Sequence, residues 1–212
     1  MSFHLPKIYP ITDTALSSLS HAEQVKDLVA GGATLIQLRE KHNSARAFHA
    51  DAYDAIRITR SAGAKVIIND RVDVALALGA DGVHLGQTDM PVAAARRLLG
   101  NAAIIGFSAH TIEQIKAALD LPIDYLAFGP IFPTQSKRNP DPVAGLDALS
   151  LIKSINSRLP IVAIGGIDKL NVVEALSAGA DSAAIISAIV ADPTQIAKNV
   201  RDFLTLAATQ QR

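Results

Sequence analysis

Eight short runs of β-branched and aliphatic residues recur along this 212-residue chain, and a segment with helical spacing follows each of them. Segments such as 22–32 and 171–180 place apolar residues three and four positions apart, which is typical of amphipathic helices. Strands that alternate with helices indicate βαβ units and a parallel sheet. The predicted strands cover residues 7–12, 34–39, 65–69, 82–86, 103–108, 124–129, 161–165 and 182–187.

Three helix-to-strand junctions resemble one another, because a glycine, an alanine and a polar residue precede the strand in each. We expect Gly31, Gly79 and Gly179 at helix C-caps in the left-handed conformation, which glycine adopts without strain. These glycines lie 48 and 100 residues apart, which corresponds to two and four βα units, and eight such units fill the chain. We therefore predict an α/β fold, a (β/α)8 TIM barrel in a single domain over residues 1–212, rather than an open doubly wound sheet.

The composition argues against several classes of protein. Lys plus Arg and Asp plus Glu number 20 each, so the basic excess typical of nucleic-acid and anionic-membrane binders is missing. Cysteine is absent, which excludes disulfides, thiolate metal sites and a cysteine nucleophile. The first ten residues lack a signal-peptide pattern, and the longest apolar run, 183–191, is shorter than the roughly 20 residues that span a bilayer. We expect a cytoplasmic protein with no nucleic-acid or membrane partner; a homo-oligomer is compatible with the sequence.

Polar and charged residues gather just past the predicted strands, whereas Gly, Ala, Leu and Pro precede the strands. In a barrel, the carboxyl ends of the strands and the loops after them form one face, where active sites lie. We therefore predict a functional site at that face. The residues concerned are Arg39, Glu40, Lys41, Asn69, Asp70, Gln87, Asp89, Ser108, residues 134–137, Gly165, Gly166 and Ser187.

Asp70 and Asp89 follow neighbouring strands, which lie roughly 4.8 Å apart in a sheet. Two such carboxylates could share a hard cation, and Mg²⁺ fits because it needs only one or two carboxylates besides phosphate oxygens. Asn69 would then face the ligand or orient a carboxylate. Alternatively, Asp70 caps the helix that follows it, and Asp89 caps a helix with Pro91 at its first position. The six histidines are expected at surface or packing positions.

Gln37, Arg39 and Lys41 occupy alternate positions of one extended segment, so their side chains share a face, which points inward in a barrel. Unpaired charges are unfavourable there. A diphosphate would pair with Arg39 through two hydrogen bonds and with Lys41 as a point charge. The alternative is an ion pair from Arg39 or Lys41 to Glu40 or Asp70.

A second anion site is predicted after the last two strands, where barrels often bind phosphate through backbone N–H groups and a short helix. Gly165 and Gly166 allow close approach of the backbone, and Ser187 adds a hydroxyl. The long connection 128–145 supplies further polar groups, at residues 134–137. Connections of this length often form lids or binding loops, the alternative being an exposed, proline-rich loop.

The chain resembles the thiamine-phosphate synthase family over nearly its full length. The matching stretches are YPITD, GGATLIQLREK, IINDRVDVALALGADGVHLGQTDMP, IGFSAHT, DYLAFGPIFPT, AIGGI and IISAI. The resemblance implies a TIM-barrel transferase that joins 4-amino-2-methyl-5-pyrimidinylmethyl diphosphate to hydroxyethylthiazole phosphate, or its 2-carboxy form. The products would be thiamine phosphate and pyrophosphate, with CO₂ from the carboxy form. It also implies a dissociative substitution assisted by Mg²⁺.

The resemblance further implies roles for individual residues. Those that would bind the pyrimidine diphosphate are Gln37, Leu38, Arg39, Glu40, Lys41, Asn69, Ser108 and Lys137. Within this set the catalytic residues would be Arg39, Lys41, Ser108 and Lys137. Asp70 and Asp89 would hold Mg²⁺. Those that would bind the thiazole phosphate are Thr134, Gln135, Ser136, Gly166, Ile186 and Ser187.

Two positions depart from the family pattern. Ser136 stands where the family usually has threonine, and because the hydroxyl is kept we expect little change. Ala144 is an extra residue near the end of the long loop, so the path of that loop is expected to differ.

Three other functions fit parts of the sequence. A paralogous thiazole tautomerase shares the barrel but needs no metal site for a diphosphate, whereas Asp89, Pro130 and Pro133 match the synthase pattern. A Schiff-base aldolase would use a barrel lysine such as Lys137, which lies in a loop poorly suited to that chemistry. A vitamin-binding regulatory module would have weakened catalytic groups, yet all the expected groups are present.

Overall fold

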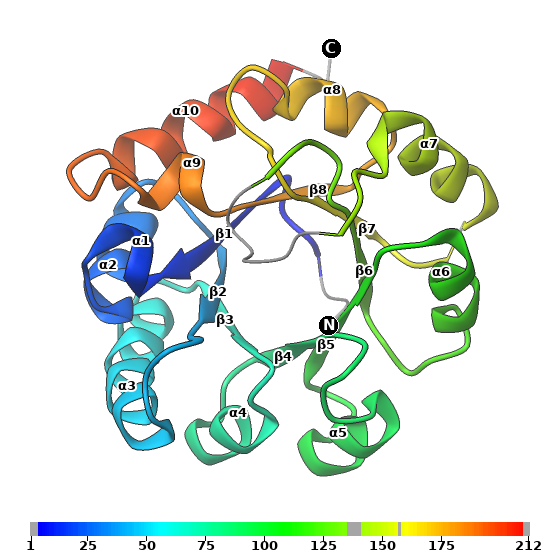
Figure 1. Cartoon of the computed structure of the whole chain (residues 1–212). Coiled ribbons are helices and arrows are strands. Elements are labelled where there is room, and N and C mark those ends of the chain that lie inside the picture. Colours follow the sequence, from blue (N-terminus) through cyan, green and yellow to red (C-terminus); the bar gives the residue numbers. More distant parts are fainter. Residues whose placement is uncertain (1–3, 135–140, 157, 210–212) are drawn as a thin grey trace.

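Eight parallel strands close into a barrel in the computed structural model of the chain, and helices surround this barrel (Figure 1). The structure describes residues 4–134, 141–156 and 158–209. The strands follow one another in chain order, and β8 pairs with β1 to close the barrel. They are β1 (Ile8–Asp13), β2 (Leu35–Arg39), β3 (Lys65–Asn69), β4 (Gly82–Leu85), β5 (Ile104–Ala109), β6 (Tyr125–Phe128), β7 (Ile161–Ile164) and β8 (Ser182–Ile185). The predicted (β/α)8 barrel is confirmed, and every predicted strand is present within two residues of its expected bounds.

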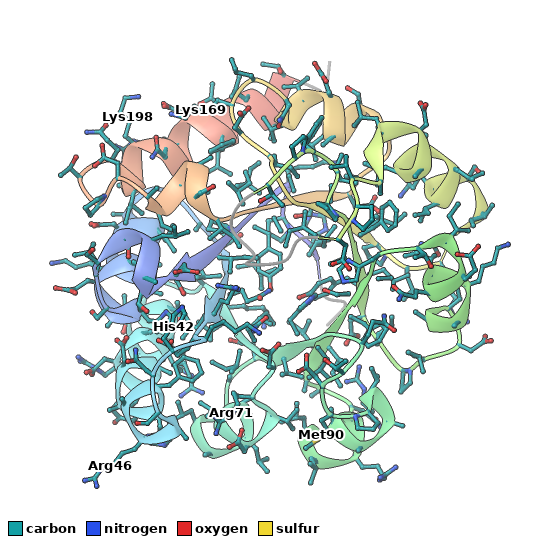
Figure 2. The ribbon with its side chains drawn as sticks, viewed as in Figure 1. His42, Arg46, Arg71, Met90, Lys169 and Lys198 are labelled. Carbon is teal, nitrogen blue, oxygen red and sulfur yellow. The ribbon has the colours of Figure 1, made fainter. Side chains whose placement is uncertain are left out.

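The outer ring consists of the helices that follow the strands (Figure 1). They are α1 (Thr14–Ser17), α2 (His21–Ala30), α3 (Ala45–Ser61), α4 (Val72–Leu78), α5 (Val92–Leu99), α6 (Ile112–Ala118), α7 (Gly145–Ile155), α8 (Val172–Ser177), α9 (Ser187–Val190) and α10 (Ile196–Ala208). Charged side chains such as Arg46, Lys169 and Lys198 project from the outside of this ring (Figure 2). Lys169 and Lys198 both pair with Asp202, at 2.5 and 2.8 Å. Exposed pairs of this kind contribute little to stability, so the fold depends on its core.

Two apolar clusters form the core, because the side chains of a strand point alternately to its two faces. In β2, Ile36 and Leu38 point outward and belong to the large cluster between barrel and helices. Leu35 points inward and belongs to the small cluster inside the barrel. Leu5, which precedes β1, also belongs to the inner cluster and closes the barrel at the amino ends of the strands. The opposite end is therefore the one left for polar groups.

One of the three predicted glycine conformations is wrong. Gly79 and Gly179 have φ of +59° and +110°, as expected, but Gly31 has φ −78° and Gly32 takes the left-handed conformation instead. Gly31 is needed for a different reason, since a Cβ atom there would lie 2.6 Å from the Cβ of Val200. Its lack of a side chain lets α10 pack against the end of α2.

Within the described ranges, no helix is both long enough and apolar enough to cross a membrane.

Candidate active site

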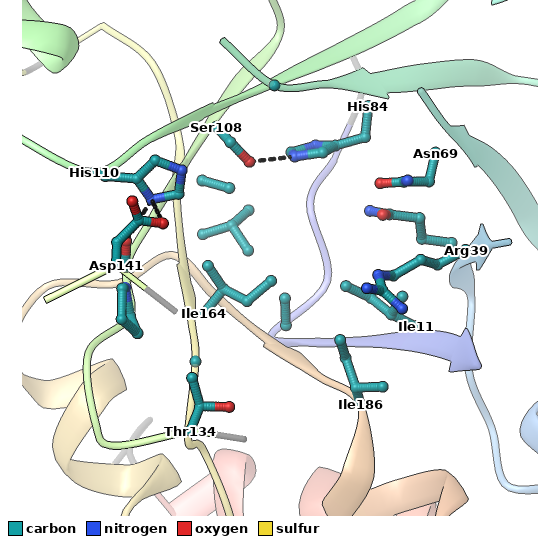
Figure 3. Close-up of a pocket in the computed structure, with 18 of the residues that line it drawn as sticks. Ile11, Arg39, Asn69, His84, Ser108, His110, Thr134, Asp141, Ile164 and Ile186 are labelled. Atoms are coloured by element: carbon teal, nitrogen blue, oxygen red, sulfur yellow. Dashed lines mark hydrogen bonds and ion pairs between the residues drawn. The ribbon is translucent and has the colours of Figure 1, made fainter. Parts of the chain in front are cut away.

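A cavity of about 540 Å³ opens at the carboxyl ends of the strands. Figure 3 shows Arg39, Asn69, His84 and Ser108 on one side of it, facing the space that Thr134 faces from the other side. The predicted site residues that line this cavity are Gln37, Arg39, Lys41, Asn69, Asp70, Gln87, Asp89, Ser108, Thr134, Gly165, Gly166, Ile186 and Ser187. The structure thus brings together residues that are up to 150 positions apart in the sequence.

Two of the predicted site residues have side chains that point elsewhere. Leu38 lies in the core between barrel and helices. Glu40 accepts hydrogen bonds from the backbone N–H groups of His42 (2.6 Å) and Asn43 (3.0 Å), and from the Asn43 side chain (2.7 Å). Only their backbone is left to contact a ligand. The predicted residues 135–137 lie outside the described part of the chain.

Arg39 is held by a neighbour on β1. Its Nη1 atom lies 2.5 Å from an oxygen of Asp13, whose other oxygen accepts the backbone N–H groups of Ala15 and Leu16 at the start of α1. The expected alternative, an ion pair of Arg39 with Glu40 or Asp70, is therefore wrong. A guanidinium has five N–H donors, so Arg39 keeps donors for an anion in the cavity.

The neighbouring cation, Lys41, does pair with Asp70, as the second alternative expected. Both side chains line the cavity, and that of Lys41 is partly exposed. Since a partly exposed ion pair is weak, an anion in the cavity can recruit Lys41 at little cost.

Neither Asp70 nor Asp89 caps a helix through its side chain. The N-cap of α4 is Arg71 and that of α5 is Pro91, and neither helix start has a side-chain cap. Asp70 has φ +60° and donates its backbone N–H to the carbonyl of His84 on the next strand. The capping alternative is therefore wrong.

The two carboxylates instead lie close together, and the pKa of Asp70 reflects this. Burial raises the pKa of Asp70; Lys41 opposes this shift, and the nearby Asp89 adds to it. Asp89 also accepts the backbone N–H of Gly86, at 2.7 Å. In the described residues no cluster of three or more His, Cys, Asp or Glu side chains could hold a metal. Two crowded carboxylate groups on a cavity wall fit Mg²⁺, which takes its remaining ligands from water and phosphate.

Asn69 presents an unused donor at the same wall. Its side chain is 7% exposed, and in the described part of the chain its Nδ2 atom has no hydrogen-bond partner. A buried polar group without a partner is destabilising. An acceptor on a bound ligand would satisfy it.

A chain of hydrogen bonds crosses the inside of the barrel below this wall. Gln37 Nε2 donates to Tyr9 Oη (3.0 Å), which contacts Tyr125 Oη (3.0 Å). Tyr125 Oη contacts His84 Nδ1 (3.0 Å), and His84 Nε2 contacts Ser108 Oγ (2.8 Å; Figure 3). Burial raises the pKa of both tyrosines and lowers the pKa of His84 to about 4. At neutral pH all three groups are uncharged.

The expectation that histidines occupy only surface or packing positions is wrong for His84 and His110, which both line the cavity. His110 Nδ1 lies 2.7 Å from the carbonyl of Gly129 and 3.6 Å from a carboxylate oxygen of Asp141 (Figure 3). For His84 the sequence held a signal, because it lies at the inward position of a strand between the outward residues Val83 and Leu85. No comparable signal marks His110, whose partners come from a different loop.

The second predicted anion site takes the expected form of a glycine turn beside a short helix. Gly165 and Gly166 have φ of +97° and +65°, and the carbonyl of Gly166 accepts a hydrogen bond from Asn171 (2.9 Å). A Cβ atom on Gly166 would lie 2.4 Å from the carbonyl oxygen of Pro133, so only glycine fits. Helix α9 begins at Ser187, directly after β8. The first N–H groups of a helix have no acceptor within it and can face an anion.

A closed (β/α)8 barrel with a polar cavity at the carboxyl ends of its strands defines a TIM-barrel enzyme. The family model described as thiamine monophosphate synthase matches residues 8–189, and the chain belongs to this family. It is accordingly a transferase with thiamine-phosphate synthase activity.

Individual relatives agree with this assignment. The chain is 46% identical over 209 residues to the thiamine-phosphate synthase of Chloroflexus aurantiacus, covering 97% of this chain and 95% of that protein. It is 42% identical over 207 residues to that of Koribacter versatilis, covering 94% of this chain and 96% of that protein. The solved structure of thiamine phosphate pyrophosphorylase from Pyrococcus furiosus matches with a TM-score of 0.86 and 36% identity, over 96% of each chain.

Proposed function

We propose that the cavity binds 4-amino-2-methyl-5-pyrimidinylmethyl diphosphate together with hydroxyethylthiazole phosphate, or its 2-carboxy form, and joins them. The observation that carries this proposal is the presence of two polar regions on one cavity. Arg39, Lys41 and Asp70 lie at one region, and Gly166 and Ser187 at the other. Two substrates that each carry phosphate need two such regions facing a common space.

The pyrimidine diphosphate is assigned to the region after β2 to β5. Arg39 and Lys41 are the cations for the diphosphate, and the free amide donor of Asn69 supplies a further hydrogen bond. Gln37 and Ser108 face the same space. The contributions of Leu38, Glu40 and Lys137 to this substrate stay predictions.

Asp70 and Asp89 are the residues that would hold Mg²⁺, since the Asp89 carboxylate lies close enough to Asp70 to raise its pKa. When bound, the ion would neutralise charge on the diphosphate and so assist its departure. Lys41, now paired with Asp70, would be free to turn to the diphosphate once the carboxylate has another partner.

The thiazole phosphate is assigned to the region after β7 and β8. Backbone N–H groups at Gly166 and at the start of α9, with the hydroxyl of Ser187, suit a phosphate group. Thr134 and Ile186 line the same cavity. The roles of residues 135–136 at this substrate stay predictions.

The reaction breaks the bond between the pyrimidine methylene carbon and a diphosphate oxygen, and the electron pair leaves with pyrophosphate. The thiazole nitrogen then supplies its lone pair to the methylene carbon and becomes positively charged. No general base is required, because that nitrogen carries no proton. Arg39 and Lys41 stabilise the charge that grows on the departing diphosphate, and Ser108 donates a hydrogen bond to its oxygen.

The test is mass spectrometry of the purified protein incubated with both substrates, with Mg²⁺ and with a chelator. We expect thiamine phosphate and pyrophosphate in equal amounts, formed only with the metal. Parallel reactions with the two forms of the thiazole establish which one is used. Binding of both substrates without product would contradict the proposal and favour a tautomerase-like or regulatory function.

We also propose that residues 1–212 form one domain and that the protein works in the cytoplasm. A homo-oligomer stays compatible with the sequence, and sedimentation of the purified protein would decide its state.

A further inference from the structure

Five polar side chains from five different strands form a continuous chain of hydrogen bonds inside the barrel. In the order in which the hydrogen bonds connect them, they are Gln37, Tyr9, Tyr125, His84 and Ser108. The two ends line the cavity, and so do Tyr9 and His84. The middle, formed by the tyrosines, is at most 1% exposed. Buried polar groups are unfavourable unless they are hydrogen-bonded, which these tyrosines are, and the proposed chemistry assigns the tyrosines no role.

Counting donors shows which group donates in each of these hydrogen bonds. The amide nitrogen of Gln37 can only donate, so Tyr9 Oη accepts from it. The Tyr9 proton then needs an acceptor, and in the described part of the chain its hydroxyl meets only Gln37 and Tyr125. Tyr9 therefore donates to Tyr125. The reverse direction would leave a buried hydroxyl proton without an acceptor.

The same counting fixes the state of the imidazole. Tyr125, having accepted from Tyr9, donates its own proton to His84 Nδ1 at 3.0 Å. A neutral imidazole carries one proton, which must then be on Nε2. Nε2–H donates to Ser108 Oγ at 2.8 Å. The proton of Ser108 then cannot point back at His84. The Ser108 side chain lines the cavity, so this proton is left for a ligand there (Figure 3).

The packing holds the imidazole in this arrangement. The rings of His84 and Tyr125 stack with centroids 5.5 Å apart and an interplanar angle of 25°. Gly106, on the strand between them, leaves the space for this stack. A Cβ atom there would lie 2.1 Å from Tyr125 Cζ and 2.5 Å from His84 Nδ1.

We propose that Tyr9 and Tyr125 are positioning residues that set the protonated nitrogen of His84, and through it make Ser108 a hydrogen-bond donor to the departing diphosphate. This inference rests on the proposed function for the role of Ser108, but the state of His84 can be measured without turnover. A hydroxyl aimed at the leaving oxygen before the bond breaks stabilises the transition state more than one that must first rotate.

A double-mutant cycle tests the coupling. Tyr125→Phe should lower kcat about tenfold with less than a twofold change in KM, because residues in one hydrogen-bond network are coupled. In a Ser108→Ala background the same substitution should change kcat less than twofold. Independent effects of the two substitutions would overturn the proposal. Tyr53→Phe, on the exposed face of α3, is the matched control and should change nothing.

A spectroscopic readout separates this inference from the proposed function. In protein with ¹⁵N-labelled histidine, the His84 ring should carry its proton on Nε2, with the resonance assigned by its loss in His84→Gln. In Tyr125→Phe or Tyr9→Phe a population protonated on Nδ1 should appear. A wild-type proton on Nδ1 would overturn the inference even in an active enzyme. If the wild type makes no thiamine phosphate yet shows the Nε2 proton, the proposed function fails together with the role of Ser108, while the positioning of His84 by the tyrosines stands.

Discussion

At the scale of the residue, Asp70 is placed where it is unfavourable for the ligand-free protein. It has a left-handed backbone, it is partly buried, and it lies close enough to Asp89 for that carboxylate to raise its pKa. Left-handed conformations in residues other than glycine are uncommon and cluster at functional sites. Its arrangement fits a role with a bound cation.

Asp70→Asn should therefore affect stability and activity in opposite directions. A carboxyl whose folded-state pKa is raised binds more protons when folded, so it reduces stability as pH rises through that pKa. Without metal at pH 7, the variant should resist thermal unfolding better than the wild type, and the difference should shrink towards acid pH. Its kcat should fall at least about a hundredfold.

Thermal melts with and without Mg²⁺ complete this test. Since a ligand stabilises the state it binds, Mg²⁺ should raise the melting temperature of the wild type but not of Asp70→Asn. Asp73→Asn, an exposed carboxylate that pairs with Arg71, is the matched control and should behave as the wild type. An unchanged kcat in Asp70→Asn at saturating substrate would rule out the metal assignment.

At the scale of the element, the turn after β7 combines two requirements that only glycine meets. Gly166 has φ +65°, and it packs against Pro133 and Phe132 from the connection after β6. Two loops that face the proposed thiazole phosphate region are thereby held against each other. The space between them is set by the missing side chain.

Gly166→Ala should push these loops apart and raise KM for the thiazole phosphate at least about tenfold, equivalent to about 1.4 kcal/mol. Gly63→Ala is the matched control, because Gly63 has a similar φ of +71° but nothing within 4 Å of its missing Cβ atom. The control should lose about 1 kcal/mol of stability from backbone strain alone and keep its KM. Steady-state kinetics measure KM, and urea unfolding measures the stability of both variants. Equal KM values for Gly166→Ala and Gly63→Ala would contradict the proposed geometry.

At the scale of the whole molecule, Glu40 ties β2 to the first helices of the barrel. It accepts a hydrogen bond from Thr14 (3.2 Å) and lies 3.4 Å from His21 on α2. Burial would raise the pKa of Glu40, but hydrogen bonds from Asn43 and His42 outweigh it and lower this pKa to about 2. Its position suits a structural role, although its sequence neighbours face the cavity.

Glu40→Gln should lower the free energy of unfolding at pH 7 by roughly 2 kcal/mol, since a lowered carboxyl pKa stabilises the folded state. This contribution is present above the unfolded-state pKa of about 4.3 and is lost as pH falls towards 2. Urea unfolding of both proteins between pH 2 and pH 7 should give curves that converge in acid. Glu174→Gln, which replaces an exposed carboxylate on α8, is the control. If the free energy of unfolding of Glu40→Gln differed from that of the wild type by the same amount at every pH, this explanation would be contradicted.

Much of the fold could be predicted because it depends on local patterns. The eight strands were recognisable from apolar runs, and their polar C-terminal ends indicated the face that bears the site. The left-handed conformation of Gly32 was not predictable from the junctions, because contact between α2 and α10 decides which glycine of the pair adopts it.

The candidate site was predictable in its strand-end residues and not in its long-range partners. Alternation along β2 and the two residues after it was enough to place Gln37, Arg39 and Lys41 on the cavity. Nothing local indicated that Arg39 pairs with Asp13, or that two tyrosines connect Gln37 to His84.

The sequence by itself determined the order of strands and helices, the barrel class and the face that carries the chemistry, because each follows from spacing along one segment. Only the tertiary structure decided the hydrogen-bond partners, the effect of Asp89 on the pKa of Asp70, and the burial that keeps His84 neutral. These properties depend on distances between strands that barrel closure brings together. Closure sets them through packing in three dimensions, which no single segment encodes.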